Sequence, residues 1–498
     1  MAEVKITTMA LEDSITQWWE PQRTKDGKRR QYRILLDGQE TAVTEKTYLT
    51  IENLEPDREY SVEILPVDGG HFVSACIRTS PEKRRLDVTK APYLAAGDGK
   101  AMDTRAIQQA IDDCGPEEKV YLPAGIYKTG ALRLHSNMEL YLEEGAVLQG
   151  TACQEDYLPR IKSRFEGTEM ECYSSLLNLG ELNREGGYSC ENVLIRGKGV
   201  IASGGQALAR SIIESERIRL REYLKELGDK VQECENLDTI PGRVRPRLIN
   251  ISNSRNIRIS GLTLANGASW NVHMIYSDGI VTDHCTFRSE GVWNGDGWDP
   301  DSSTNCTLFA CEFYTGDDSV AVKSGKNPEG NRINKPSRGI RIFDCRCMFG
   351  HGIALGSEMS GGIEDVYIWD CDLSRSMYGI EVKATRKRGG YVREIRVENC
   401  RVPRIMMHSV LYNDDGEDSG SVPYFENCRI RDTEITGRCL DDKGCWQECT
   451  AVELCGFDEP GHEVSNVEFS NVAFGPGVPA AISLRRCRNV TFENISQN

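Results

Sequence analysis

The sequence lacks any long apolar run, since no stretch reaches the roughly 20 consecutive apolar residues of a membrane-spanning helix. Residues 1–7 also lack the apolar region of a secretory signal. The composition is not that of a disordered chain, because 39% of the residues are hydrophobic and 27% are charged. We therefore expect a globular cytoplasmic protein without a membrane partner.

Basic charge is scarce relative to acidic charge. The chain has 60 Lys and Arg residues against 76 Asp and Glu residues, which gives a formal net charge of -16. A nucleic acid would be repelled by this field, so the sequence argues against a nucleic-acid partner. The same field would repel a long polyanionic substrate unless a local basic patch offsets it.

Cysteine is abundant, with 19 residues, but an odd number in a chain without an export signal favours reduced thiols over disulfides. Cys439, Cys445, Cys449 and Cys455 cluster near the end of the chain. Their spacing could hold zinc after folding, although the Cys-x-x-Cys pairs of common structural zinc sites are missing. Buried free thiols are the favoured interpretation, and a metal site is the alternative.

Residues 1–85 alternate apolar and polar side chains between turn residues, which predicts a small antiparallel β-sandwich. The spacing from Leu54 to Tyr60 resembles the tyrosine corner of fibronectin type III domains, whose ring hydroxyl bonds to the backbone. The charged residues 80–85 predict a linker. We interpret this domain as a spacer or a cover for the main domain, with sugar binding as the alternative.

Residues 86–498 carry a repeated pattern, clearest from about residue 192: a polar residue, a short β-branched run, then often Cys or Asn. From Cys285 to Cys428 the repeated cysteines recur at intervals of 26, 34, 26, 29 and 28 residues, in the range of repeat architectures. The pattern predicts an all-β domain, a right-handed parallel β-helix with cysteines stacked between coils.

A charged run at about 206–232 interrupts the repeat and has Leu220, Tyr223, Leu224 and Leu227 at helical spacing. It predicts an inserted helix. A solvated insertion is the default interpretation. Narrowing of a cleft or self-association into a homo-oligomer is the alternative.

Three aspartates carry the candidate chemistry. Gly316-Asp317-Asp318 follows Asp296 by about one coil, so stacked coils would place the three carboxylates on one surface patch. Like charges at that range raise one another's pKa values, so one carboxyl can stay protonated as an acid while another stays ionised as a base. Glycoside hydrolysis needs such a pair.

These aspartates belong to an ordered series: Asn294-Gly295-Asp296, Gly316-Asp317-Asp318, Gly350-His351-Gly352 and Lys383. The series resembles the Asn-Thr-Asp, Gly-Asp-Asp, Gly-His-Gly and Arg-Ile-Lys motifs of glycoside hydrolase family 28, the polygalacturonase family, in the family's order. The resemblance runs from about residue 93 to the C-terminus. It implies a parallel β-helix and an inverting glycoside hydrolase that uses no cofactor and no metal.

The resemblance also implies roles. Asp317 would protonate the glycosidic oxygen, Asp296 and Asp318 would hold the attacking water, and His351 would hydrogen-bond near the acid. The acid and the carboxyls that hold the water are expected roughly 6.5–9.5 Å apart. The side chains expected to contact the substrate are Asn294, Lys383, Glu358, and the aromatic residues Trp270, Trp298 and Tyr378, of which at least one is expected to pack in the core instead.

One motif departs from the family. The chain has Glu381-Val382-Lys383 where the family has Arg-Ile-Lys, and a glutamate would repel the galacturonate carboxylate that the arginine contacts. Either Arg386 or Arg388 swings in to bind that carboxylate, or the substrate carries a neutral sugar at this subsite.

Residues 356–362 and the N-terminal domain together resemble the exo-acting members of the family. We therefore expect an exo-acting hydrolase that removes a terminal galacturonate from small pectin-derived oligosaccharides. A neutral sugar released from a plant glycoside or a pectin side chain is the alternative. The competing interpretations are a Ca²⁺-dependent, pectate-lyase-like β-helix and a non-catalytic carbohydrate-binding β-helix.

Overall fold

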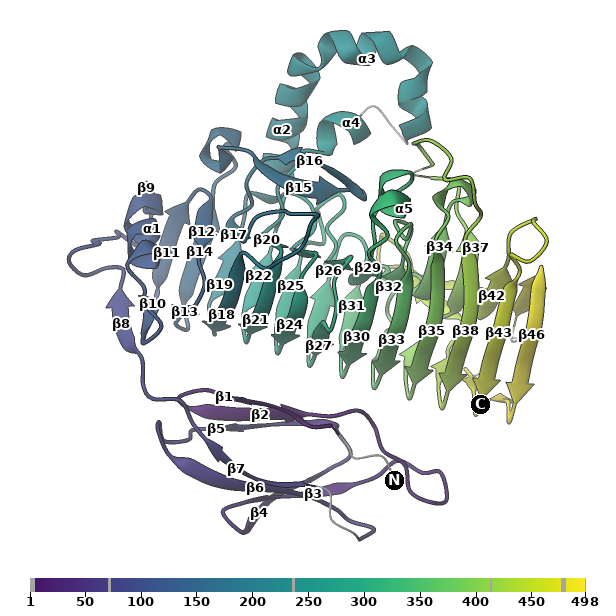
Figure 1. Ribbon diagram of the computed structural model, residues 1–498, viewed down its shortest axis with the longest axis horizontal. Coiled ribbons are helices and arrows are strands. Elements are labelled where there is room, and N and C mark those ends of the chain that lie inside the picture. Colours follow the sequence, from purple (N-terminus) through teal and green to yellow (C-terminus); the bar gives the residue numbers. More distant parts are fainter. Residues whose placement is uncertain (1–4, 70–72, 235–237, 413, 476–480, 498) are drawn as a thin grey trace. The chain divides into compact units, whose positions relative to one another are not determined.

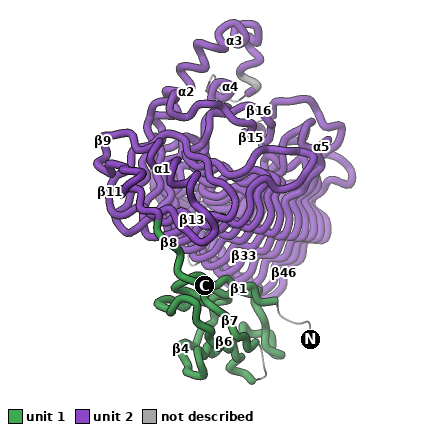
Figure 2. The backbone as a smooth tube through the Cα atoms, turned by 60° about the vertical axis from the view of Figure 1, so that its left-hand side comes forward, with its two compact units in different colours: residues 1–85 green, residues 86–498 purple. Residues whose placement is uncertain are grey.

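The structure is a computed structural model that describes residues 5–69, 73–234, 238–412, 414–475 and 481–497. The chain divides into two compact units, Met1–Arg85 and Leu86–Asn498 (Figure 2). Within the described residues, none of the helices is both long and apolar enough to cross a membrane.

The first unit consists of two antiparallel sheets whose strands are β1 (Thr7–Ala10), β2 (Ser14–Trp18) and β5 (Tyr48–Glu52), and β4 (Gln39–Thr44), β3 (Tyr32–Leu36), β6 (Glu59–Pro66) and β7 (Val73–Arg78). Alternate residues of β6, including Tyr60 and Ile64, are buried against side chains of the other sheet such as Ile15 and Leu49. The Tyr60 hydroxyl accepts a hydrogen bond from the Glu55 backbone N–H (2.8 Å). The predicted antiparallel sheets are present, and the fibronectin type III class stays a prediction.

The second unit is a parallel β-helix built from long parallel sheets (Figure 1). The 13-stranded sheet contains β8 (Arg84–Asp87), β10 (Glu118–Leu122), β13 (Met138–Leu142), β18 (Cys190–Gly197), β21 (Ser254–Ser260), β24 (Asp278–Asp283), β27 (Thr307–Phe309), β30 (Ser337–Phe343), β33 (Ile363–Trp369), β35 (Tyr391–Glu398), β38 (Tyr424–Arg431), β43 (Val464–Ser470) and β46 (Cys487–Glu493). The 11-stranded sheet contains β12 (Leu132–Leu134), β17 (Leu177–Leu179), β20 (Ile249–Ser252), β23 (Val272–Ile275), β26 (Trp298–Asp301), β29 (Val320–Val322), β32 (Gly352–Leu355), β34 (Gly379–Ala384), β37 (Ile405–Ser409), β42 (Val452–Cys455) and β45 (Ile482–Arg485).

Two shorter sheets make up the third side of the coils. The eight-stranded sheet contains β9 (Asp98–Met102), β11 (Gly125–Thr129), β14 (Ala146–Gly150), β19 (Val200–Ala202), β22 (Thr263–Ala265), β25 (Thr286–Arg288), β28 (Glu312–Tyr314) and β31 (Arg346–Phe349). The four-stranded sheet contains β36 (Arg401–Val402), β39 (Glu434–Ile435), β44 (Ala473–Phe474) and β47 (Ser496–Gln497). The predicted all-β parallel helix is confirmed.

The remaining elements are turns, hairpins and helices attached to these coils: α1 (Thr104–Asp112), η1 (Gln154–Tyr157), the hairpin β15 (Ile161–Phe165) and β16 (Thr168–Cys172), α5 (Glu329–Ile333), η3 (Arg386–Arg388), and the hairpin β40 (Arg438–Leu440) and β41 (Trp446–Glu448).

A stack of cysteines runs through the core, as predicted. Its members are buried, and each thiol donates to the carbonyl two residues upstream at 3.2–3.4 Å; they are Cys285, Cys311, Cys345, Cys371 and Cys400. The prediction is wrong for Cys428, which lies on β38 between Ile395 and Val467 of the neighbouring strands. Thr433 makes the equivalent bond to Arg431 O (2.9 Å). Coil lengths differ, so an even spacing in sequence does not ensure the same position on the coil.

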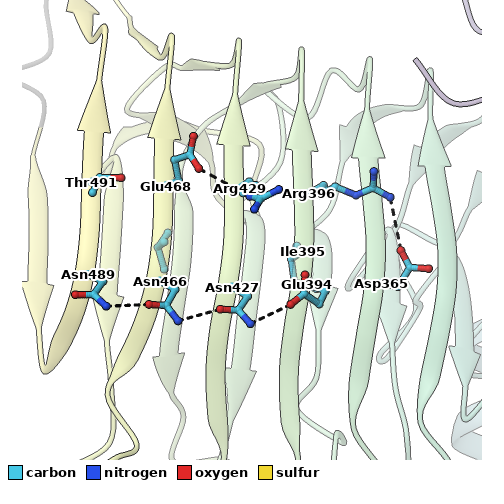
Figure 3. A pocket seen from close by; sticks show the side chains of 11 residues that line it. Asp365, Glu394, Ile395, Arg396, Asn427, Arg429, Asn466, Glu468, Asn489 and Thr491 are labelled. Atoms are coloured by element: carbon cyan, nitrogen blue, oxygen red, sulfur yellow. Dashed lines mark hydrogen bonds and ion pairs between the residues drawn. The ribbon is translucent and has the colours of Figure 1, made fainter. Parts of the chain in front are cut away.

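Asparagines hold the register on the outer face of the 13-stranded sheet, where they line a polar hollow (Figure 3). Asn489 donates to Asn466 (3.0 Å), Asn466 donates to Asn427 (3.0 Å), and Asn427 donates to Glu394 (2.9 Å). The φ angles of these asparagines are 54° to 58°, the left-handed conformation that asparagine tolerates. These three asparagines, together with Glu394 on the next coil, link four successive coils and keep them aligned.

The charged run at about 206–232 lies in α2 (Gly205–Arg219), α3 (Arg221–Leu227) and η2 (Gly228–Cys234), followed by α4 (Thr239–Gly242). The buried apolar side chains of this insertion lie on α2, where Leu208 and Ile212 are buried. In contrast, no residue of α3 is buried. Leu220, Leu224 and Leu227, whose spacing predicts a helix, lie at the start of α3 or within it and are only half-buried. These helices and the hairpin β15–β16 project from the same side of the β-helix (Figures 1 and 2).

Candidate active site

The predicted catalytic residues gather at one edge of the 11-stranded sheet, just before strands begin. Asp296 precedes β26, Asp317 and Asp318 precede β29, and His351 precedes β32. The coils are joined there by backbone hydrogen bonds from Gly297 to Asp318 O and from His351 to Asp317 O, both 3.0 Å. The stacking predicted for Asp296 beside Asp317 and Asp318 is therefore correct.

A cavity of about 190 Å³ opens over this edge. Its lining residues are Glu166, Trp270, Asn294, Asp296, Asp317, Asp318, Lys323, His351, Gly356, Ser357, Glu358, Tyr378, Lys383 and Tyr412. This volume is below the roughly 300–1,000 Å³ of sites for drug-sized ligands, so the cavity suits one sugar unit better than a chain.

Asp317 and His351 form a close pair. His351 Nδ1 lies 3.0 Å from Asp317 Oδ1 and 3.7 Å from Asp318 Oδ1. Burial would raise the pKa of Asp317, but the charge and the hydrogen bond of His351 hold that pKa below its ordinary value. Burial would lower the pKa of His351, but the two carboxylates raise it to about 9. At neutral pH, one proton is therefore shared in the hydrogen bond between His351 Nδ1 and Asp317 Oδ1.

Asp296 lies beside a buried lysine that sequence analysis missed. Lys323 Nζ is 3.4 Å from Asp296 Oδ2 and 3.5 Å from Glu358 Oε2. Asp296 Oδ1 and both carboxyl oxygens of the fully buried Asp299 have no hydrogen-bond partner among the described residues. Burial raises the pKa of Asp296 and Asp299 well above the ordinary value, with Lys323 opposing this in both.

Asp318 belongs to a second charged group. Its Oδ2 lies 3.2 Å from Lys383 Nζ, which is also 3.0 Å from Glu381 Oε2. His408 Nε2 lies 2.7 Å from the other oxygen of Glu381. Burial raises the pKa of Asp318, whereas Lys383 and His408 outweigh burial at Glu381 and lower its pKa to about 2.

The carboxyl geometry differs from expectation in two ways. Asp317 and Asp318 each place an oxygen within 4.8 Å of the other, closer than the roughly 6.5–9.5 Å typical of inverting pairs. The carboxyls with raised pKa values are Asp296 and Asp318, whereas the pKa of Asp317, the predicted acid, is lowered. The neighbouring histidine causes this reversal.

Four residues predicted to contact substrate do not line the cavity. Trp298 is fully buried in the core and donates to Thr282 Oγ1 (3.1 Å), so the prediction that it stacks on a sugar is wrong. Arg388 is fully buried, and its Nε donates to Ser357 O (2.9 Å), so it cannot swing toward substrate. Glu381 is enclosed by Lys383 and His408.

Arg386 lies outside the cavity and forms an ion pair with Glu459. The other predicted contacts, Asn294, Lys383, Glu358, Trp270 and Tyr378, line the cavity. The ring of Trp270 stacks on that of Phe165, with 4.7 Å between the ring centres, and Lys323 Nζ lies 4.5 Å from the centre of the Trp270 ring. Much of the Trp270 surface is therefore already covered.

Several lining or supporting residues carried no sequence signal. Glu166 and Tyr412 reach the cavity from the β15–β16 turn and from the loop after β37, and Arg245 supports it from beyond α4. Lys323 follows β29 directly, five residues after Asp318. Its position at the end of the strand that Asp318 precedes was the one sequence feature that could have predicted its place in the site.

One group in this cavity could hold a metal ion. Asp317, Asp318 and His351 each offer one ligand atom within 4.8 Å of the others. The raised pKa of His351 and the ammonium of Lys383 beside Asp318 already place two positive charges there. These charges oppose the binding of a divalent cation.

The alternative zinc site is not formed. In the parts of the chain that the structure describes, Cys439, Cys445, Cys449 and Cys455 do not bring three thiols together. All four are free cysteines, but the prediction that they are buried holds only for Cys439, since Cys449 and Cys455 are half-buried and Cys445 is exposed.

The comparisons with known proteins agree with this geometry. The chain is similar to the exo-poly-alpha-D-galacturonosidase of Dickeya chrysanthemi, with 26% identity over 465 residues covering 88% of this chain and 76% of that protein. Its fold is similar to that of a family 28 exopolygalacturonase from Yersinia enterocolitica, with a TM-score of 0.81, 22% identity, and coverage of 99% of this chain and 98% of that one.

A second solved structure shares the fold. The exopolygalacturonase from Thermotoga maritima has a TM-score of 0.65 and 24% identity, covering 83% of this chain and 92% of that one. The family model described as "Glycosyl hydrolases family 28" matches residues 161–497, which include the whole candidate site. The chain therefore belongs to glycosyl hydrolases family 28.

Proposed function

We propose that the protein is an exo-acting, inverting hydrolase that releases terminal galacturonate from small oligogalacturonides. The observation that carries this proposal is the small cavity in which Asp296, Asp317 and Asp318 meet. The similarity to an exo-poly-alpha-D-galacturonosidase supports the same substrate. The test is to identify the products of the purified protein on oligogalacturonides and on a panel of neutral plant glycosides.

Exo action is supported by an ion-pair network behind Glu166, which lines the cavity. Arg243 donates to Glu166 Oε2 and to Asp415 Oδ2, both at 2.7 Å, and Lys326 forms an ion pair with Asp415. The Lys326 backbone N–H also donates to Gly167 O (2.9 Å). Four segments far apart in sequence are thereby joined behind Glu166, and in this proposal they support one wall of the cavity and limit how much of a chain can enter.

Replacing Asp415 with alanine should loosen this wall, because Arg243 and Lys326 would lose the acid that they share. We expect dimers to account for about a tenth or more of the early products from pentagalacturonate, measured by chromatography. Asp283→Ala is the control, since it breaks another Arg–Asp pair, the more deeply buried Arg258–Asp283 pair on the 13-stranded sheet. If Asp415→Ala releases only monomer, the network does not set product length.

The proton for the leaving group is supplied by the Asp317–His351 pair in this proposal. Asp317 Oδ1 lies 3.0 Å from the Nδ1 of a histidine that is protonated at neutral pH. As the glycosidic bond breaks, the leaving oxygen becomes more basic. His351 then gives its Nδ1 proton to Asp317, and Asp317 passes a proton to the leaving oxygen, so the pair ends as a neutral imidazole beside an ionised carboxylate. Asp317 therefore acts as the acid although its own pKa is lowered.

Attack by water requires a base on the opposite face of the sugar. Asp296 and Asp318 are the candidates, with Lys323 and Lys383 beside them to favour the ionised carboxylate. The alternative is that Asp296 is the acid, which its raised pKa favours. In the proposed reaction one C–O bond breaks, water supplies the new C–O bond, and its proton goes to the base.

Glu381 does not by itself exclude a uronic acid substrate. Its carboxylate is paired with Lys383 and His408 and does not line the cavity. Lys323 and Lys383 remain as lining cations that could bind a sugar carboxylate. The lining also contains five acids, Glu166, Asp296, Asp317, Asp318 and Glu358, which keeps a neutral sugar as the second candidate.

Activity should be insensitive to a chelator, because His351 and Lys383 already neutralise the carboxylates that a metal would need. We expect less than a twofold change in rate with excess EDTA. The control is the same assay after added Ca²⁺. A loss that Ca²⁺ restores, with an unsaturated product, would instead indicate a lyase.

A further inference from the structure

Arg245 is a buried cation without a counter-ion. Its side chain is fully buried, and in the described part of the chain no carboxylate lies within ion-pair distance of it. Burial, the largest effect, lowers its pKa to about 10. Buried charges are ordinarily paired, so an unpaired guanidinium calls for an explanation.

The hydrogen bonds of Arg245 point to that explanation. Its Nε donates to Gly242 O (2.8 Å), and Nη1 donates to Ala268 O (3.2 Å) and Trp293 O (2.9 Å). Nη2 donates to Asn294 Oδ1 (2.6 Å). Two of the four bonds therefore hold the segment that leads directly into Asp296.

The bond to Asn294 determines which way its amide faces. An arginine has donors and no acceptor, so the Asn294 oxygen must face Arg245. The amide nitrogen then faces Asp317, with Nδ2 3.5 Å from Asp317 Oδ2. This distance is long, as catalytic hydrogen bonds often are before substrate binds.

We propose that Arg245 is a positioning residue that fixes the Asn294 amide so that its N–H points at Asp317. With the amide reversed, an oxygen would face the carboxylate, and two acceptors would repel each other. The donor also restrains Asp317 on the side opposite His351. This inference rests on the proposed role of Asp317.

Arg247 provides a matched control two residues away. It is equally buried, and it donates to Arg245 O (2.6 Å), to Arg164 O, and to Ser163 Oγ and His273 Nδ1 (both 3.4 Å). Among the described residues, none of the hydrogen bonds of Arg247 reaches a residue that lines the cavity. Removing it costs a buried guanidinium and its bond to the Arg245 backbone, whereas the hydrogen bond from the Arg245 side chain to Asn294 keeps both of its partners.

The experiment compares Arg245→Met with Arg247→Met on trigalacturonate. We expect Arg245→Met to lower kcat by about 10–100-fold, the effect of losing an oriented charge-assisted hydrogen bond, with KM changed less than about threefold. Arg247→Met should lower the melting temperature by a similar amount while kcat stays within about threefold of wild type. Equal losses of kcat in both variants would mean that Arg245 is only structural.

A double-mutant cycle tests the route through Asn294. In an Asn294→Ala background, Arg245→Met should cause no further loss of kcat, because the amide that Arg245 orients is gone. Fully additive losses would overturn the inference. If Arg245→Met fails to fold, Arg245→Lys replaces it, since lysine lacks the second terminal nitrogen with which Arg245 bonds Trp293 O and Asn294 Oδ1 separately.

Asp317→Asn separates this inference from the proposed function. An active Asp317→Asn protein would defeat the proposed acid and with it the reason to orient Asn294. An inactive Asp317→Asn protein together with wild-type kcat in Arg245→Met would defeat the positioning role alone.

Discussion

Asp317→Asn should abolish hydrolysis of oligogalacturonides, with a loss of at least about 10³-fold, while an aryl galacturonide with an acidic phenol as leaving group should lose less than about tenfold. The reason is that a good leaving group departs without protonation, so only the poor leaving group needs the acid. Asp296→Asn should lose activity on both substrates, because the attacking water needs its base in either case. Initial rates on the two substrates measure this contrast.

The control for folding is the circular dichroism spectrum and melting temperature of each variant, since an Asp-to-Asn change keeps the side-chain shape. The opposite pattern, in which Asp296→Asn is rescued by the activated leaving group and Asp317→Asn is not, would assign the acid to Asp296. That result would agree with the burial that raises the pKa of Asp296 and would leave Asp317 as the base.

The β-helix and the position of the three aspartates were predictable because both depend on local repetition. Each coil returns the chain to the same edge, so Asp296 and Asp317, 21 residues apart, had to meet once the coil length was known. Coil length is itself set by short β-branched runs between polar turns. The same reasoning placed most of the cysteines correctly and failed at Cys428, where the coil was longer.

The facing of residues beside the aspartates was harder to predict. In a strand, successive side chains point to opposite faces, but Asp296 lies in the turn before β26, where this alternation does not yet apply. The position of Asp296 therefore did not predict whether Trp298 or Asp299 faces the core. Within β34 alternation does hold, and Glu381 and Lys383 therefore lie on one face and pair. The pairing could have been inferred from Glu381-Val382-Lys383 alone.

The supporting charges could not be predicted, because they come from segments with no regular spacing. Arg243 and Arg245 follow the helical insertion, and Asp415 lies in a loop after β37. Their contacts depend on how loops from distant coils fold over the cavity, which no periodic pattern encodes. The direction of the pKa of Asp317 was missed for a different reason. The contact with His351 was expected, but the charge of that histidine and its hydrogen bond hold the pKa of Asp317 below its ordinary value despite burial, and this balance depends on the folded site.

Lys323→Met should lower kcat/KM by about 10²-fold at pH 7, because Lys323 is the cation that favours ionisation of Asp296. Without it, the already raised pKa of Asp296 rises further, and the base is more often protonated. The acid limb of the pH–rate profile should therefore move to higher pH, and activity should partly recover as the pH increases. Rates from pH 5 to pH 9 measure this shift. An unshifted profile would mean that Lys323 does not control the ionisation of the base.

The stability of this variant should follow the opposite trend. Asp296 and Asp299 have folded-state pKa values above the unfolded values, so their contribution to stability is complete below the unfolded pKa and is lost as the pH rises through the folded pKa. Removing Lys323 makes that ionisation more costly. We expect the variant to resemble wild type near pH 4 and to lose about 3 kcal/mol of unfolding free energy near pH 8, measured by denaturant titration.

Lys119→Met is the matched control, because Lys119 is also buried and lies over an aromatic ring, 5.4 Å from the centre of Tyr141, in the first coils. It should leave the pH–rate profile unchanged. A rise in activity together with a fall in stability over the same pH range would identify ionisation of the Asp296 group as the common cause, since a general packing defect would lower both at every pH. A constant stability loss from pH 4 to pH 8 would instead assign Lys323 a packing role over Trp270.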